Sequence, residues 1–152
     1  METIEKSVEV LNDLVEINND RIAGFGHASK DLGDDNMDLK ALFQTFREES
    51  RYNVEELNTA IRQSGGDPDT GTSGAGTIHR TWLDVKATFT GHDRKSILEE
   101  CERGEDAIKK AYQDALSPDS GLSPEFNAIV SRQREGIIAA HNQVKALRDG
   151  ME

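Results

Sequence analysis

The two halves of this chain repeat one pattern of polar and apolar residues at an offset of 87 residues. Each half has the pattern of two helices joined by a short turn, which is a helical hairpin. Two such hairpins in 152 residues favour a four-helix bundle, because each hairpin must bury its apolar face against the other. The residues matched by the offset are Asn18 with Glu105, Phe25 with Tyr112, Arg47 with Arg134, and Glu48 with Glu135.

Apolar residues recur at spacings of three and four along four segments, which is the pattern of amphipathic helices. The turn within each half is short, so the paired helices are expected to run antiparallel. The sequence therefore predicts hairpins over 3–63 and 93–149, in a single domain that spans 1–152. The predicted helices cover residues 3–30, 37–63, 93–116 and 124–148.

Residues 64–92 connect the two hairpins. Their first part is rich in glycine and hydroxyl residues, which is typical of a linker, and the apolar spacing over 77–90 predicts a short helix. A long connection between two hairpins is characteristic of the ferritin-like arrangement. The expected fold is all-α: a ferritin-like four-helix bundle, built from two antiparallel hairpins, with a short extra helix in the long crossover.

One face of the first segment carries the apolar residues Leu11, Val15, Ile22 and Phe25. These residues are the predicted contribution of the segment to the core. Apolar residues away from the predicted faces, such as Ile17 and Ile138, are expected to point outward and favour a homodimer.

The composition disfavours several classes of partner. A net charge of −11 without a basic stripe argues against nucleic acid and against an anionic membrane surface. No apolar run of about 18 residues could cross a membrane. The single cysteine, Cys101, cannot form an internal disulfide and lies on an apolar helix face. The first residues carry charges and no apolar signal segment, so the expected location is the cytoplasm.

Polar residues interrupt the apolar faces near the middle of the helices, where ferritin-like proteins hold two iron ions. Such a centre needs a Glu from each of two helices and a Glu-x-x-His pair from each of the other two. The corresponding positions of this chain retain one carboxylate, so we expect no functional di-iron centre, no catalytic residue and no cofactor. The six positions are Asn18, Ser50, Asn53, Glu105, Ile137 and Ala140.

Gln133 interrupts the last apolar face in the same way. One interpretation of this polar layer is structural, because buried polar groups fix helix pairing and register. The other is a binding site: Glu105, without an evident cationic partner on the apolar faces, has a raised pKa or holds a ligand. The predicted layer consists of Asn18, Ser50, Asn53, Glu105 and Gln133.

Other titratable residues offer one alternative. The side chains of Glu16, Glu49, Glu102 and Glu135 fall opposite or beside the apolar faces, where solvent exposure is the norm. His141 lies at the edge of its apolar face, which favours a partly buried hydrogen-bonding residue. The alternative is an off-centre site for iron or another divalent metal, formed by Glu102, Glu105 and His141.

Segments 11–20, 98–106, 132–133, 140–141 and 147–149 together resemble an uncharacterised bacterial family of small four-helix-bundle proteins in the ferritin-like superfamily. The resemblance covers nearly the whole chain. It implies a cytoplasmic ferritin-like bundle of unknown function, with distant relatives described as stress-associated. It supplies no active site, and none of the di-iron ligands of that superfamily is carried over.

The expected function is that of a non-catalytic binding or structural protein, and the resemblance implies an association with stress. A protein partner could bind along the acidic surface. The alternative function is iron storage or oxidation at the off-centre carboxylate and histidine site.

Overall fold

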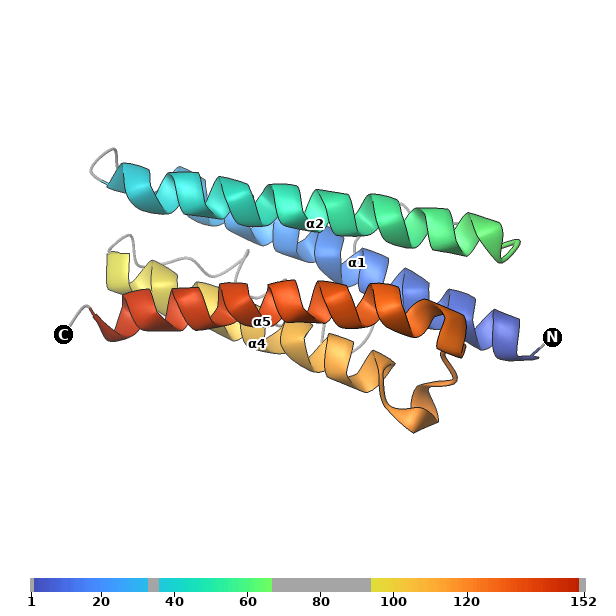
Figure 1. Cartoon of the computed structure of the whole chain (residues 1–152). Helices are drawn as coiled ribbons and strands as arrows, with labels where there is room; N and C mark the ends of the chain where they lie inside the picture. Colours follow the sequence, from blue (N-terminus) through green and yellow to red (C-terminus); the bar gives the residue numbers. More distant parts are fainter. Residues whose placement is uncertain (1, 33–35, 67–93, 151–152) are drawn as a thin grey trace.

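The computed structural model describes residues 2–32, 36–66 and 94–150, and these residues are almost entirely helical (Figure 1). The described ranges contain no strand, so the all-α prediction is confirmed at this level. The predicted short helix over 77–90 and most of the crossover lie outside the described residues. The α-helices are α1 (Glu2–Asp31), α2 (Met37–Gln63), α4 (Arg94–Ala115) and α5 (Asn127–Asp149), with 3-10 turns at η2 (Pro118–Ser120) and η3 (Pro124–Phe126).

The helices form two antiparallel hairpins, α1 with α2 and α4 with α5 (Figure 1). α1 also packs along α4, which brings the hairpins together. At one end of the bundle, Arg94 at the start of α4 donates two hydrogen bonds of 3.0 and 2.7 Å to Asp38 at the start of α2. The Arg94 guanidinium lowers the pKa of Asp38 to about 2. α2 and α4 therefore begin at the same end and run in the same direction.

The opposite end is closed by two serines that are 116 residues apart. Ser7 of α1 donates a hydrogen bond of 3.0 Å to Ser123 Oγ, and the Ser123 amide donates one of 2.9 Å back to Ser7 Oγ. The chain reaches Ser123 through Gly121, which has a φ of +84° and whose Cβ position would lie 2.8 Å from the Lys6 side chain. Both the backbone conformation and the close approach favour glycine there.

Most of the predicted inward residues are buried, but α1 buries a wider face than the one predicted. Ile22 is only half-buried, and Arg21 beside it is fully buried. Ile17, expected to point outward, is also fully buried, while Ile138 is half-buried. The expectation for Ile17 was wrong because α1 packs on both α2 and α4 and so buries a wider face than one apolar stripe.

Cys101 is a free, buried cysteine, as its place on an apolar face predicts. Burial raises the pKa of its thiol well above the usual value, so the thiol stays protonated and behaves as a small apolar group. Within the described ranges, no helix is both long enough and apolar enough to span a membrane.

Adjacent isoleucines on α5 provide a test of its packing. Ile137 is fully buried and Ile138 half-buried. Truncation of Ile137 to Ala leaves a cavity in the core and should lower the free energy of unfolding by about 2–5 kcal/mol. Ile138→Ala is the matched control and should cost clearly less. Urea unfolding followed by circular dichroism measures both, and equal losses would contradict this orientation of α5.

Candidate functional site

All five residues of the predicted polar layer are buried. Asn18 lies on α1, Ser50 and Asn53 on α2, Glu105 on α4 and Gln133 on α5. The layer therefore receives side chains from each of the four described α-helices. A role in binding a ligand stays a prediction, but the geometry of the layer can be followed bond by bond.

The centre of the layer is an ion pair between Arg21 of α1 and Glu105 of α4. Arg21 Nε donates to Glu105 Oε1 at 2.7 Å, and Arg21 Nη2 donates to Glu105 Oε2 at 3.0 Å. Both side chains are fully buried. The prediction that Glu105 lacks a cationic partner was wrong. The two parallel hydrogen bonds form the fork-shaped contact by which arginine best binds a carboxylate.

The third nitrogen of the guanidinium faces α2. Arg21 Nη1 donates to Glu49 Oε1 at 2.8 Å, to Ser50 Oγ at 2.9 Å and to the backbone oxygen of Phe46 at 3.3 Å. The guanidinium carbon also lies 5.4 Å from the ring centres of Phe25 and Phe46, a distance at which aromatic faces attract cations. Glu49, expected to be solvated, is instead a partly buried partner of Arg21. Arg21 thus contacts three helices.

A chain of hydrogen bonds continues from Arg21 through the layer. Ser50 Oγ donates to Asn18 Oδ1 at 2.9 Å, and Asn18 Nδ2 donates to the Tyr112 hydroxyl at 2.9 Å. The Tyr112 hydroxyl donates to Gln133 Oε1 at 2.6 Å, and Gln133 Nε2 donates to Glu56 Oε1 at 2.8 Å. Asn53 adds a longer bond of 3.3 Å to Asn18 Oδ1. The buried amides and hydroxyls of the layer are thus satisfied by one another, as the structural interpretation requires.

Burial and ion pairing act in opposite directions on Glu105. Burial raises the pKa of Glu105, and the adjacent Arg21 charge offsets part of that rise. For Arg21, burial opposes the charge, but Glu105 and Glu49 outweigh it, so the pKa of Arg21 is raised and the guanidinium is charged. Burial likewise raises the pKa of Tyr112, which keeps its hydroxyl protonated as a hydrogen-bond donor.

These residues do not fit a di-iron group. Each of the six positions that correspond to di-iron ligands is buried, as a ligand would be, but five carry amides, a hydroxyl or apolar side chains. Glu105 is the remaining carboxylate, and both of its oxygens accept hydrogen bonds from Arg21. A positively charged guanidinium beside this carboxylate repels further cations. The positive charge that balances the buried glutamate is therefore supplied by the protein itself.

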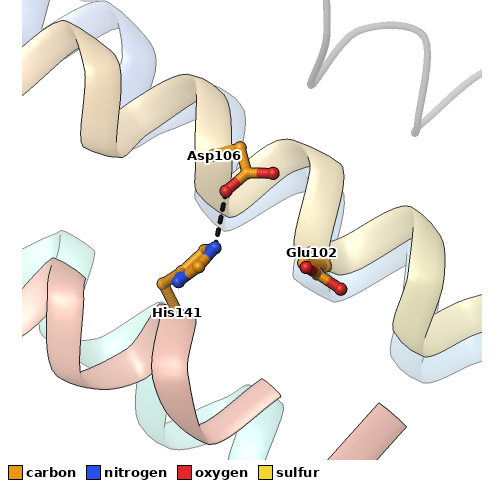
Figure 2. A group of neighbouring side chains, drawn as sticks. All are labelled: Glu102, Asp106 and His141. Carbon is orange, nitrogen blue, oxygen red and sulfur yellow. Dashed lines mark ion pairs between the residues drawn. The ribbon is translucent and has the colours of Figure 1, made fainter. Parts of the chain in front are cut away.

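A second group of chemical interest lies between α4 and α5 (Figure 2). Glu102, Asp106 and His141 each offer one ligand atom, and these atoms lie within 4.8 Å of one another. His141 Nε2 is 2.5 Å from Asp106 Oδ1, and Glu102 forms an ion pair with Arg148. The off-centre metal site was predicted to consist of Glu102, Glu105 and His141. Glu105 instead pairs with Arg21, and Asp106 takes the third place.

Residues 6–118 match the protein family described as Domain of unknown function (DUF2383). The chain belongs to this family. The match covers α1, α2 and α4 and ends before α5, which carries Gln133 and His141. No curated protein matches the chain. Membership of the DUF2383 family agrees with the predicted resemblance to an uncharacterised family, and it assigns no activity.

Two residues of these groups escaped prediction although the sequence carries a signal for each. The offset of 87 residues places Arg21 on Ile108, an apolar residue of the second hairpin. Asp106 follows Glu102 by four residues, the spacing that places two side chains on one side of a helix. Both residues are charged, and charged side chains are rarely buried without a partner.

The ion pair between Arg21 and Glu105 in this DUF2383 protein can be tested by removing one partner and then both. Arg21→Met leaves the Glu105 charge buried without its partner and should lower the free energy of unfolding by about 3–5 kcal/mol. The double variant Arg21→Met, Glu105→Leu removes both charges and should recover much of that loss. The control is Arg103→Met, which removes an exposed arginine paired with Glu100. Urea unfolding gives all three values. A loss in Arg21→Met no larger than that in the control would contradict the role given to the pair.

The raised pKa of Glu105 predicts a pH dependence. The folded protein holds this proton to a higher pH than the unfolded chain, whose ordinary value is 4.5. The contribution of Glu105 to stability is therefore complete below that pH and is lost as the pH rises through the folded pKa.

Glu105→Gln cannot titrate at this position, so it is the reference. The free energy of unfolding of the wild type minus that of the variant should fall as the pH rises from about 4 towards 8. Parallel urea titrations across this range measure the difference. A difference that grows with pH would show that the pKa of Glu105 is lowered instead.

Proposed function

We propose that this protein is a ferritin-like helical bundle without a functional di-iron centre, and that it acts as a non-catalytic binding or structural protein. The observation that carries the proposal is the position of the Arg21 guanidinium, which holds Glu105 and Glu49 in the middle of the bundle. The arginine performs there the charge-balancing role that metal ions perform in di-iron proteins.

The directions of the helices support the ferritin-like part of the proposal. α2 and α4 run in the same direction, so α4 begins at the end of the bundle opposite to the one where α2 ends (Figure 1). One long crossover between antiparallel pairs is the connection that ferritin-like bundles use. The burial of all six positions that correspond to ligands agrees with this arrangement.

The enclosure of the layer supports the non-catalytic part. Arg21, Glu105, Asn18 and Tyr112 are each fully buried and hydrogen-bonded to one another or to neighbours in the layer. A substrate would need an opening and an unengaged acid, base or nucleophile. These buried residues are enclosed and already hydrogen-bonded, so they meet neither requirement. The layer is better suited to holding four helices in register.

Binding then belongs to the outer surface. The described exposed surface includes two large apolar side chains, Met37 at 64% and Tyr52 at 63% exposure, both on α2. Two exposed apolar side chains on one helix, on a chain with a net charge of −11, suit a protein partner or a second copy of the chain. A cytoplasmic role in stress physiology is part of the same proposal and follows from the family resemblance alone.

Iron storage or oxidation is the second candidate, and the cluster of Glu102, Asp106 and His141 favours it. Three ligand atoms suit one cation. Oxidation at a di-iron centre needs two adjacent ions and about six protein ligands. This observation therefore supports the binding of a single ion more than oxidation.

The proposal is tested by titrating the untagged protein with ferrous iron while oxygen uptake is recorded. We expect no oxygen uptake above that of buffer, because the layer has no place for two ions. The His141→Ala variant is titrated in parallel, so that iron held by the cluster is not mistaken for iron in the layer. About two equivalents of bound iron with oxygen consumed, retained in His141→Ala, would overturn the proposal.

A further inference from the structure

We infer that Glu102, Asp106 and His141 form a site for one divalent ion of the zinc class, which joins α4 to α5 (Figure 2). The three residues lie outside the hydrogen-bond network around Arg21. The inference therefore stands independently of the proposed function, since a bundle with or without a catalytic layer can hold this ion.

The backbone positions of the three residues suit a common ligand. Glu102 and Asp106 are four residues apart on α4, so their carboxylates project from one side of that helix. His141 approaches from α5 with a ring nitrogen facing Asp106 (Figure 2). The three ligand atoms lie within 4.8 Å of one another. Tetrahedral zinc with bonds of about 2.0–2.2 Å places its ligands roughly 3.4 Å apart. Small side-chain rotations can bring the three ligand atoms from within 4.8 Å of one another to this separation.

The hydrogen bonding of His141 leaves Nε2 available to a cation. Asn142 Oδ1 lies 3.3 Å from Nδ1 and can only accept, so the tautomer that forms this hydrogen bond carries its hydrogen on Nδ1. In the neutral ring, Nε2 then has a lone pair, and it faces Asp106 Oδ1 at 2.5 Å. Two electron-rich atoms this close repel each other unless positive charge lies beside them. Apart from the ion-pair contact with Asp106, Nε2 has no hydrogen-bond partner in the part of the chain that the structure describes, and the residue is only 7% exposed.

The positive charge beside His141 and Asp106 could come from a proton or from a divalent ion. The nearby carboxylate of Glu102 favours the divalent ion. Its Oε2 atom is buried and forms no regular hydrogen bond within the described ranges, although Arg148 approaches it as an ion pair. One proton on His141 balances one carboxylate. One divalent ion balances both carboxylates, and it releases Arg148 to solvent, where that side chain is already partly exposed.

The donor set identifies the class of ion. One imidazole nitrogen with two carboxylate oxygens suits zinc and its neighbours in the first transition row, whereas magnesium and calcium prefer oxygen donors alone. Three protein ligands leave a fourth position for water. The bond from Nδ1 of His141 to the Asn142 amide is the kind of outer contact that orients a histidine ligand.

The test uses the full-length chain without an affinity tag, titrated with Zn²⁺ by calorimetry and with Co²⁺ by visible absorption. We expect one equivalent of either ion, and a melting temperature that rises with Zn²⁺. Asp106→Asn, at an exposed position, and His141→Ala should each weaken binding by at least about tenfold. Asp114→Asn on α4 and His27→Gln on α1 are the matched controls and should bind as the wild type does.

Arg148→Gln tests the third ligand. It frees Glu102 from its competing partner and should tighten binding by up to about fivefold, the usual strength of an ion pair open to solvent. An affinity equal to or below that of the wild type would overturn the assignment of Glu102 as a ligand. No binding of either ion, or binding retained in both Asp106→Asn and His141→Ala, would overturn the site itself.

Discussion

The buried charge of Arg21 is the constraint on which the arrangement of the helices depends. A guanidinium removed from water must find acceptors for its hydrogens, or the bundle loses several kcal/mol. Glu105 supplies two acceptors from α4, and Glu49, Ser50 and the Phe46 carbonyl supply three from α2. Sliding either helix by one turn, about 5 Å, would break these bonds together. The core outside this polar layer is apolar and would tolerate several registers, so the ion pair selects one.

A buried ion pair in place of apolar residues favours specificity of helix packing over stability. Apolar replacements of buried ion pairs are often as stable as the pair or more so, because two charges need not be removed from water. A bundle packed only by leucine and isoleucine would hold its helices with less definition of partner and register. The Arg21 network instead accepts a desolvation penalty and obtains a single arrangement in which α1, the helix that packs on both α2 and α4, is central.

Sequence periodicity predicted the helix bounds closely, since Met37–Gln63 was expected and observed as α2. It also placed Asn18, Ser50, Asn53, Glu105 and Gln133 inside, because each interrupts an apolar face. It did not place Arg21 or Ile17, because α1 packs against two helices and buries a face wider than one stripe. Sequence periodicity also cannot identify which residues pair across helices. The pairing of Arg21 with Glu105 spans 84 residues and depends on the rotations of α1 and α4 about their axes, which residue spacing does not fix.

The hydrogen bonds along the path that begins with Arg21 and Ser50 all have the same direction. Each donor along the path from Arg21 to Ser50, Asn18, Tyr112, Gln133 and Glu56 faces away from the cation and towards the carboxylate at the far end. The bond dipoles are therefore aligned head to tail and strengthen one another. The chain has a polarity set by its two charged ends, and reversing the amide of Asn18 or Gln133 would set like groups face to face. Two ends of opposite charge thus impose a single orientation on every neutral group between them.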